Sequence, residues 1–517
     1  MRKTMPLRWA ALGLVLILAL TAGIHAQRQQ PPEYKEFAAA TRIQDAAVRL
    51  KEFERIKAAY PASVMMATID MYIHTSKVEL ADTLEAILVL QKDFLAKSQG
   101  PARLQGPLMA SAQILTHPKI AAFDKSKVLA AVLQYRELSL KTATDPAAFQ
   151  GVPEEQRSDF KAFVRNMFGI RVAQAYLNAG DEAKASAALD AYLKDGGAPD
   201  ALYWYTKGAS LALLGKLPEA YDAYLAAAVE NYEDSTIKAK ALYGKINDKE
   251  GGFEAALEAK LRTLPYHAEP FKPAADWKGK TVLAEIFTGS ECPPCVGADL
   301  GFDGLLEAYP VKTLAVLEYH LPIPRPDPLM NPATQMRQEY YAVNSTPTVF
   351  IDGDKKLVGG GSRGSSESKF KQYKSEIDAR INAVPAFVLK ALAVYKGDTV
   401  KVDCAFDAPG PAIEIYVALV QEEEKYKGSN GLSFHKMVVR DVAIFPAGAR
   451  VASFDLAKSE QITDQYLTEF ENTNTRFQGF KFPERHAKIA RQGLRVVVFA
   501  QEKSTKKVLN AIVADVK

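Results

Sequence analysis

The spacing of hydrophobic residues changes twice along the chain and divides it into three regions. Over residues 30–264, apolar positions recur at helical spacing, and Ala, Leu, Lys and Glu dominate. Over residues 276–384, short apolar runs alternate with helical segments, a pattern typical of an α/β sandwich around a mixed sheet. Over residues 386–517, apolar residues alternate or cluster over strand lengths. We therefore expect a multidomain chain with an α-helical, an α/β and a β-sandwich-like domain, in that order.

Residues 1–26 have the pattern of a secretory signal peptide. The basic residues Arg2, Lys3 and Arg8 precede an uncharged run over 9–22, and Ala26 is a small residue at a suitable cleavage position. The run is shorter than the roughly 20 residues that a membrane-spanning helix needs. We expect export to the periplasm or secretion, with no membrane contact beyond this segment. An uncleaved anchor is the alternative.

The helical region contains an internal repeat within residues 168–228. Small and apolar positions of a first copy recur in a second copy with a period close to the roughly 34 residues of the tetratricopeptide repeat, which the pattern resembles. The matching positions are Ala173, Tyr176, Gly180 and Ala185 in the first copy and Gly208, Leu211, Gly215 and Ala220 in the second. Two interpretations stay open: a concave surface that docks a partner protein, or a helical packing module without a ligand.

Composition excludes several classes of function. The chain of 517 residues is 48% hydrophobic and 24% charged, as in globular proteins. Its formal net charge of +4 falls to +1 when the three basic residues of the signal segment are removed. A nearly neutral protein offers no electrostatic reason to bind nucleic acid, and we expect no such partner. Its three cysteines are too few for a disulfide-stapled scaffold of this size.

Two of the three cysteines form the motif Cys292-Pro293-Pro294-Cys295. It follows an apolar strand predicted over 281–287 and opens a helix predicted over 296–309. The free N–H groups and positive end of a helix stabilise a thiolate, which is the species that attacks disulfides. The spacing of the cysteines lets the second sulfur resolve a mixed disulfide. We expect Cys292, at the exposed start of the helix, to be the nucleophile and Cys295 to be the resolving residue.

A second segment, Thr346-Pro347-Thr-Val-Phe-Ile-Asp-Gly, leads into another apolar strand. Together with Trp277-Lys-Gly-Lys-Thr-Val-Leu-Ala-Glu-Ile-Phe and the CPPC motif, it resembles the thioredoxin-like superfamily, and within it exported TlpA-type thiol–disulfide oxidoreductases. The resemblance covers roughly residues 276–384 and implies a thioredoxin-like domain there. It also implies a cis peptide bond before Pro347. The implied substrate groove is formed by Pro293, Pro294, Thr346 and Pro347.

The sequence departs from that family at two positions beside the motif. Glu291 stands where the family often has an aromatic residue, and a carboxylate there opposes formation of the Cys292 thiolate. Classical thioredoxins carry a buried acid at the position of Ile286. Glu285 is one residue away and faces the opposite side of the strand. Glu285 and Glu291 are retained as possible helpers of the chemistry, with a surface or ion-paired acid as the alternative for Glu285.

Other candidate residues are interpreted without a catalytic role. No second Cys-x-x-Cys accompanies the motif, so we expect no metal and no cofactor beyond the redox-active disulfide Cys292–Cys295. Cys404 alternates with apolar residues and is predicted to face a core, with a reactive third thiol as the alternative. His320 is interpreted as a capping or hydrogen-bonding residue at the end of a strand, with a position at a ligand site as the alternative. His435 is interpreted as a strand residue.

These patterns predict an extracytoplasmic thiol–disulfide oxidoreductase that acts through Cys292 and Cys295. Its expected partners are protein thiol or disulfide substrates and a redox partner protein. The alternative is a non-catalytic scaffold that binds proteins and contains a structural CPPC disulfide.

Overall fold

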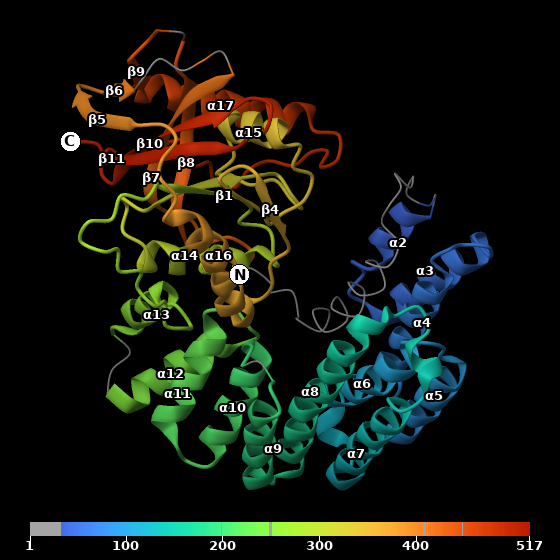
Figure 1. Ribbon diagram of the computed structural model, residues 1–517. Helices are drawn as coiled ribbons and strands as arrows, with labels where there is room; N and C mark the ends of the chain where they lie inside the picture. The colour runs from blue at the N-terminus through green and yellow to red at the C-terminus, as the bar shows by residue number, and fades with distance from the viewer. Residues whose placement is uncertain are drawn as a thin grey trace. The chain divides into compact units, whose positions relative to one another are not determined.

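The computed structural model describes residues 31, 33–197, 199–247, 251–406, 410, 412–446 and 448–517 (Figure 1). The predicted signal peptide lies outside these ranges. The chain divides into two units, Met1–Gly251 and Gly252–Lys517. A helical first unit and a second unit rich in β-strands confirm the expected multidomain, mixed architecture. Within the described ranges, no helix is long and apolar enough to cross a membrane.

The first unit is built of helices that pack against their neighbours along the chain. Several begin at a residue whose side chain accepts backbone N–H groups of the first turn, as Asp45, Thr83 and Asp124 do. The helices are α2 (Tyr34–Ala40), α3 (Ala46–Ala59), α4 (Met66–Leu80), α5 (Leu84–Lys97), α6 (Ala102–Leu115), η3 (Ile120–Ala122), α7 (Lys125–Thr142), η4 (Pro146–Phe149), α8 (Glu154–Ala179), α9 (Glu182–Lys194), α10 (Ala201–Leu213), α11 (Leu217–Ala228) and α12 (Ser235–Asn247).

The sequence repeat corresponds to two helix–turn–helix pairs, α8–α9 and α10–α11. Gly180 and Gly215 follow the first helix of each pair at φ values of +81° and +74°, which glycine adopts without strain. In the second pair, a Cβ added at Gly208 would lie 2.9 Å from Tyr224 Cγ. The small residue at this position therefore lets the two helices approach closely.

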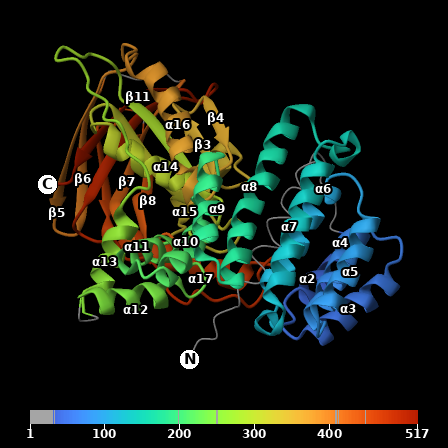
Figure 2. The same ribbon diagram turned by 90° about the horizontal axis from the view of Figure 1, so that it is seen from below.

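The second unit contains two β-sheets with helices around them (Figures 1 and 2). An eight-stranded sheet has the order β11-β10-β7-β8-β2-β1-β3-β4, and a three-stranded sheet has the order β5-β6-β9. The elements are α13 (Phe253–Arg262), β1 (Val282–Thr288), α14 (Cys295–Ala308), β2 (Leu314–His320), α15 (Pro332–Tyr341), β3 (Thr348–Ile351), β4 (Lys355–Val358), η5 (Arg363–Ser365), α16 (Ser366–Ile381), β5 (Leu389–Lys396), β6 (Thr399–Phe406), β7 (Ile413–Lys425), β8 (Phe434–Ile444), β9 (Val451–Asp455), α17 (Leu456–Thr473), β10 (Leu494–Glu502) and β11 (Val508–Asp515).

The large sheet crosses the boundary that we expected between residues 384 and 386. Strand β8 pairs in parallel with β2 through Val438 and Glu318, so the C-terminal strands extend the α/β sheet. A sandwich-like arrangement forms only where the three-stranded sheet packs its buried Val400 and Val402 near Val417 of β7. Alternation along a strand shows which face is buried but does not identify the neighbouring strand. The sequence pattern therefore suggested a separate domain.

The expected end of the helical domain at residue 264 also differs from the structure. Helix α13 belongs to the second unit, which begins at Gly252. Arg262 of α13 pairs with Glu423 of β7 at 2.7 Å, and its guanidinium carbon lies 3.7 Å from the centre of the Phe434 ring. Helix-forming residues continue across the boundary, so helical periodicity does not mark it.

Helices cover both faces of the large sheet near its centre. On one face, Phe302 of α14 contacts Tyr373 of α16 at a ring distance of 5.2 Å. On the other face, Arg337 of α15 contacts Glu285 of β1. Buried residues of β1, β2 and β3 join both helical layers in one hydrophobic core. The CPPC motif lies where β1 ends and α14 begins, on the α14–α16 side.

Candidate functional site

The CPPC motif forms the turn between β1 and α14. Cys292 and Cys295 are joined in a disulfide with an S–S distance of 2.12 Å. The Cys295 N–H donates to the Cys292 carbonyl at 3.0 Å, which closes the turn at the start of the helix. Pro293 and Pro294 are exposed. The expectation of an exposed Cys292 is wrong for this oxidised form, because Cys292 is 1% exposed and Cys295 is fully buried.

The Thr346-Pro347 segment lies against the Cys292 sulfur. The bond between Thr346 and Pro347 is cis, as the family resemblance implied, and the Ile323–Pro324 bond is also cis. Thr346 Oγ1 and the Thr346 carbonyl oxygen lie 3.4 Å and 3.8 Å from Cys292 Sγ. The Thr346 hydroxyl donates to the Ile323 carbonyl at 2.9 Å, so its proton is directed away from the sulfur. The structure thus brings together Cys292 and Thr346, which the sequence placed in one site.

Two loops cover the motif. The loop between β7 and β8, residues 426–433, contacts it through Asn430, whose N–H donates to the Ser290 carbonyl at 3.1 Å. The loop between β4 and η5, residues 359–362, contacts it through Gly361, whose N–H donates to the Pro294 carbonyl at 2.7 Å. These loops, together called the cover, donate hydrogen bonds to the backbone carbonyls of Ser290 and Pro294.

The two possible helper acids lie in different environments. Glu285 is fully buried and pairs with Arg337 at 2.6 Å, while the Tyr341 hydroxyl donates to its second carboxylate oxygen at 2.6 Å. It faces α15, away from α14. Glu291 is partly exposed and accepts the N–H of Ser429 in the cover at 3.3 Å. Glu285 is therefore engaged in an ion pair, and Glu291 lies next to the motif.

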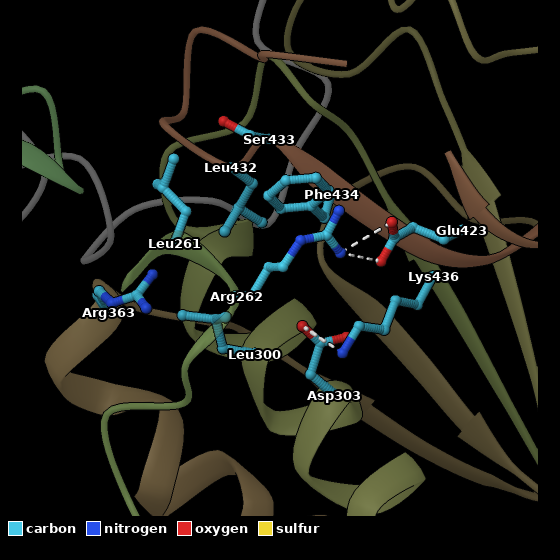
Figure 3. A pocket seen from close by; sticks show the side chains of 10 residues that line it. All are labelled: Leu261, Arg262, Leu300, Asp303, Arg363, Glu423, Leu432, Ser433, Phe434 and Lys436. Atoms are coloured by element: carbon cyan, nitrogen blue, oxygen red, sulfur yellow. Dashed lines mark hydrogen bonds and ion pairs between the residues drawn. The ribbon is translucent and has the colours of Figure 1, made fainter. Parts of the chain in front are cut away.

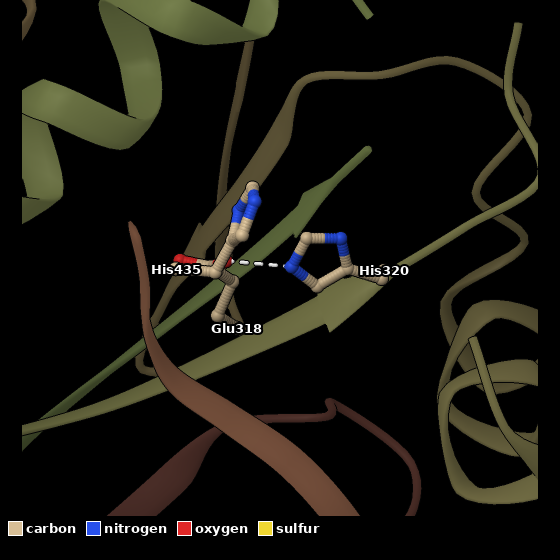
Figure 4. Close-up of side chains that lie close together, drawn as sticks. All are labelled: Glu318, His320 and His435. Atoms are coloured by element: carbon tan, nitrogen blue, oxygen red, sulfur yellow. Dashed lines mark hydrogen bonds and ion pairs between the residues drawn. The ribbon is translucent and has the colours of Figure 1, made fainter. Parts of the chain in front are cut away.

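A cluster of buried polar side chains lies at the end of β2 (Figure 4). His320 Nε2 lies 2.7 Å from Glu318 Oε1, and His435 Nδ1 from β8 lies 3.8 Å from the same oxygen. The second nitrogen of each ring is also bonded: His320 Nδ1 lies 2.9 Å from Asp327 Oδ2, and His435 Nε2 lies 3.0 Å from the Tyr426 carbonyl oxygen. We call Glu318, His320 and His435 the His–Glu cluster.

The cluster is connected to the CPPC turn through one carboxylate. The same Asp327 oxygen that bonds His320 accepts the Ser290 N–H at 2.6 Å, and its other oxygen accepts the Leu329 N–H at 2.9 Å. Burial raises the pKa of Asp327, but the His320 charge and these hydrogen bonds lower it below its usual value overall. Asp327 therefore stays ionised and links β2 to the loop that precedes Cys292.

The two histidines of the cluster have opposite charge states. Burial lowers the pKa of His320, but the charges and hydrogen bonds of Asp327 and Glu318 outweigh burial and raise it to about 10. Burial and the neighbouring His320 charge lower the pKa of His435 to about 3. Near neutral pH, His320 is an imidazolium and His435 is a neutral imidazole.

A further buried acid, Asp299 of α14, belongs to the same region. Burial and the charge of Glu318 raise its pKa well above the usual value, while the charge of His320 lowers it. Neither carboxyl oxygen of Asp299 makes a hydrogen bond of good geometry to any described residue, and the same holds for the Thr288 hydroxyl beside it. Asp299 therefore lies on the helix that begins at Cys295, as a buried carboxyl without a well-formed hydrogen bond to any described residue.

Sequence reasoning missed Glu318 and the role of His435. Glu318 is the register partner of Ile286, the residue that replaces the buried acid of classical thioredoxins. In-register residues of neighbouring parallel strands point to the same face of the sheet. The chain therefore has an acid on the face to which Ile286 points, but this acid comes from β2 instead of β1. The alternation Glu318-Tyr-His320 placed both polar residues on one side of a buried strand, and this was the signal that could have identified them.

The third cysteine lies away from these groups. Cys404 of β6 is 7% exposed within the core between the two sheets, as expected from its alternation with apolar residues. Burial, with a smaller contribution from the Asp403 charge, raises the pKa of the Cys404 thiol to about 11.

Cys404 is expected to resist alkylation in the folded, reduced protein. At pH 8 its thiol stays protonated, and the thiolate is the species that iodoacetamide attacks. Peptide mass spectrometry after a short labelling pulse should find Cys404 unmodified in buffer and fully modified in guanidinium chloride. Equal labelling rates in the two solvents would contradict the buried position of this thiol.

A small pocket lies between α13, α14 and β8 (Figure 3). Its volume is about 70 Å³, and its lining includes the pair Arg262–Glu423 and the pair Asp303–Lys436, whose charged atoms are 3.6 Å apart. Burial raises the pKa of Asp303 to about 7, although Lys436 opposes the shift. The pocket has room for a few water molecules and is far smaller than a typical ligand site. We therefore assign it no substrate.

Comparison with known proteins places the chain in no family. No family model matches it, and no curated protein matches it. Among solved structures, protein AGR_C_4864 from Agrobacterium tumefaciens aligns at 13% identity with a TM-score of 0.28, covering 46% of this chain and 94% of its own. HBP35 of Porphyromonas gingivalis aligns at 13% identity with a TM-score of 0.29, covering 47% of this chain and 77% of its own. Structural similarities with TM-scores this low support no conclusion about the fold or the function of the chain.

Proposed function

We propose that the chain is an extracytoplasmic thiol–disulfide oxidoreductase that exchanges disulfides with protein substrates through Cys292 and Cys295. The observation that carries this proposal is the closed Cys292–Cys295 disulfide at the first turn of α14, with Thr346 against the Cys292 sulfur. A helix N-terminus favours the thiolate form of a cysteine. The finer assignments belong to the same proposal: a thioredoxin-like fold for residues 276–384, tetratricopeptide-like packing within 30–264, and export directed by residues 1–26.

The proposed exchange transfers two electrons from the dithiol to a substrate disulfide. The Cys292 thiolate attacks one substrate sulfur, a mixed disulfide forms, and the other substrate sulfur leaves as a thiolate. The Cys295 thiolate then attacks Cys292 Sγ, which closes the disulfide and releases the substrate as a dithiol. A partner dithiol protein restores the reduced form by the reverse exchange. Running the same steps backwards oxidises a substrate.

Access to Cys292 requires movement of the cover. Both cysteines are buried in the oxidised form, and the contacts of Asn430 and Gly361 hold the cover on the motif. Pro293 and Pro294 remain exposed, so they are the part of the motif that a substrate meets first. We propose that an extended substrate segment displaces the loop 426–433 and lies beside Thr346.

Cys292→Ser is expected to abolish the reduction of insulin by dithiothreitol that the full-length protein catalyses. Cys295→Ser should instead retain the attacking thiol and accumulate mixed disulfides with protein substrates, because the resolving sulfur is missing. Non-reducing electrophoresis and mass spectrometry measure both results. Cys404→Ser is the matched control and should behave as the wild type.

The alternative function is a binding scaffold with a permanently closed disulfide, and the burial of both sulfurs is the observation that favours it. The same experiment separates the two functions. If the wild-type protein accelerates neither insulin reduction nor the oxidation of a reduced test protein, and the disulfide resists dithiothreitol until the chain unfolds, the oxidoreductase proposal is wrong.

A further inference from the structure

The His–Glu cluster has a donor set that the redox chemistry of the cysteines does not use. Glu318, His320 and His435 are buried, come from the neighbouring strands β2 and β8, and each offers one ligand atom within 4.8 Å of the others. Two imidazole nitrogens and a carboxylate oxygen are ligands typical of divalent transition metals. Figure 4 shows the three side chains gathered at the point where the two strands lie next to each other.

The hydrogen bonds of the two rings determine which nitrogens face the cluster. A backbone carbonyl only accepts, so the bond between His435 Nε2 and the Tyr426 oxygen requires the proton on Nε2. The ring nitrogen that faces the cluster is therefore His435 Nδ1, which lies 3.8 Å from Glu318 Oε1. A cation bound between these two atoms would be held by both of them.

The outer partners of the rings are those of metal-binding histidines. A metal-bound imidazole almost always donates its other N–H to a carboxylate or a backbone carbonyl. His320 has such a partner in Asp327, at 2.9 Å, and His435 has one in the Tyr426 carbonyl, at 3.0 Å. Asp327 is itself held by the Ser290 and Leu329 N–H groups. Both rings are thus oriented from outside, with their remaining nitrogens directed toward Glu318.

A further buried carboxyl, that of Asp299, belongs to helix α14 on the same side of the sheet. Asp299 is 6% exposed, and its carboxyl oxygens make no well-formed hydrogen bond to any described residue. Tetrahedral zinc takes four ligands in structural sites, and catalytic sites keep one position for water. Asp299 is not among the three side chains whose ligand atoms lie within 4.8 Å of one another, so water is the expected fourth ligand.

We propose that Glu318, His320 and His435 form a binding site for one divalent transition-metal ion, with Zn²⁺ as the ion that its imidazole and carboxylate ligands fit. The ion is bound by His320 Nε2, Glu318 Oε1 and His435 Nδ1, and any proton on these three atoms is released to solvent when the ion binds. The site does not include the cysteine sulfurs, and the carboxylate of Asp327 links it to the loop before Cys292. This inference goes beyond the proposed oxidoreductase function and does not depend on it.

The test uses the tag-free, full-length protein with its disulfide closed, so that Cys292 and Cys295 cannot act as thiolate ligands. After treatment with EDTA, the protein is equilibrated with Zn²⁺, separated from free metal by gel filtration and analysed by plasma mass spectrometry. We expect one Zn²⁺ per chain in the wild type and in Cys292→Ser/Cys295→Ser. The same proteins loaded with Co²⁺ should show visible absorption bands of nitrogen and oxygen ligation without a thiolate charge-transfer band.

Variants of the cluster identify the ligands. Glu318→Gln and His435→Gln should weaken Zn²⁺ binding by about 100-fold or more, and the outer-partner variant Asp327→Asn by about 10–100-fold. His267→Gln is the matched control, because His267 is an exposed histidine of the same unit, with a side-chain exposure of 78%. Circular dichroism checks that each variant is folded. A melting temperature raised by Zn²⁺ in the wild type and in His267→Gln, but not in Glu318→Gln or His435→Gln, gives a second measure.

Three results would overturn the proposal. The first is that the wild type binds no stoichiometric Zn²⁺ and Co²⁺ gives no bands, in which case His320 serves as a buried cation between Asp327 and Glu318. The second is that folded Glu318→Gln and His435→Gln retain the wild-type affinity for Zn²⁺. The third is that metal binds only after reduction and is lost in Cys292→Ser/Cys295→Ser, which would place the metal on the cysteines. None of these results depends on whether the protein reduces insulin.

Discussion

Arg337→Met is expected to lower the free energy of unfolding of the second unit by about 3–5 kcal/mol, the usual effect of removing one partner from a buried ion pair. Arg337 and Glu285 are both fully buried, and the guanidinium also donates to Gln501 of β10 at 3.0 Å. Without Arg337, the hydrogen-bond partners that remain to the Glu285 carboxylate among the described residues are the hydroxyls of Tyr319 and Tyr341. A buried charge left in this way must be neutralised or hydrated, and both cost free energy.

Native-state hydrogen exchange, resolved by peptide mass spectrometry, measures this loss in the full-length chain. Protection of the β1 and β2 amides should fall by the same free energy. Arg337→Met/Glu285→Leu should recover much of the loss, because it removes both charges at once. Lys371→Met is the control, since the Lys371–Glu367 pair is exposed on α16, and we expect a change within about 0.5 kcal/mol. A similarly small effect of Arg337→Met would show that the pair contributes little.

Gly360→Ala is expected to reduce the rate of insulin reduction by about 10–100-fold, because displacements near 1 Å at a reacting centre have effects of this size. A Cβ at Gly360 would lie 1.8 Å from the Pro294 carbonyl oxygen and 2.8 Å from Pro347 Cγ. The added methyl group therefore meets the motif and the cis-proline segment together. The loop 359–362 must move away and lose the bond between the Gly361 N–H and the Pro294 carbonyl.

The rate is measured by the turbidity of reduced insulin at equal protein concentration. Gly251→Ala is the control, because a Cβ there meets no atom of the described residues within 4 Å, and its rate should equal that of the wild type. Thermal unfolding distinguishes a displaced site from a lost fold, since the packing cost of the added methyl is expected to be only about 1–3 kcal/mol. A folded Gly360→Ala protein with the wild-type rate would show that the cover loop 359–362 does not position the motif.

Much of the local structure could be predicted because hydrophobic periodicity reports it directly. The strand over 281–287, the helix after Cys295 and the strand after Pro347 correspond to β1, α14 and β3. The choice of neighbouring strands could not be predicted in this way. Strand β8 pairs with β2 where Val438 lies beside Glu318, and these residues are far apart in the chain. No pattern within either segment encodes this pairing.

The same limit applies to the candidate site. Cys292, Cys295 and Pro347 were identified because their local sequence carries the chemistry, and the structure places Thr346 beside Cys292. The His–Glu cluster was missed because His435 reaches Glu318 only through the pairing of β8 with β2. The burial of Cys292 was missed for a related reason, since the loop that contains Asn430 comes from a distant part of the chain.

The continuous sheet has a consequence for how this protein can be divided. In an excised fragment of residues 276–384, β2 would become an edge strand with its outer N–H and C=O groups open to water. The apolar face of that strand would also lose the neighbours that β7 and β8 supply to the shared core. Such an edge pairs readily with a second chain. The segment that contains the CPPC motif therefore depends for its solubility on strands that begin more than a hundred residues after the motif along the chain.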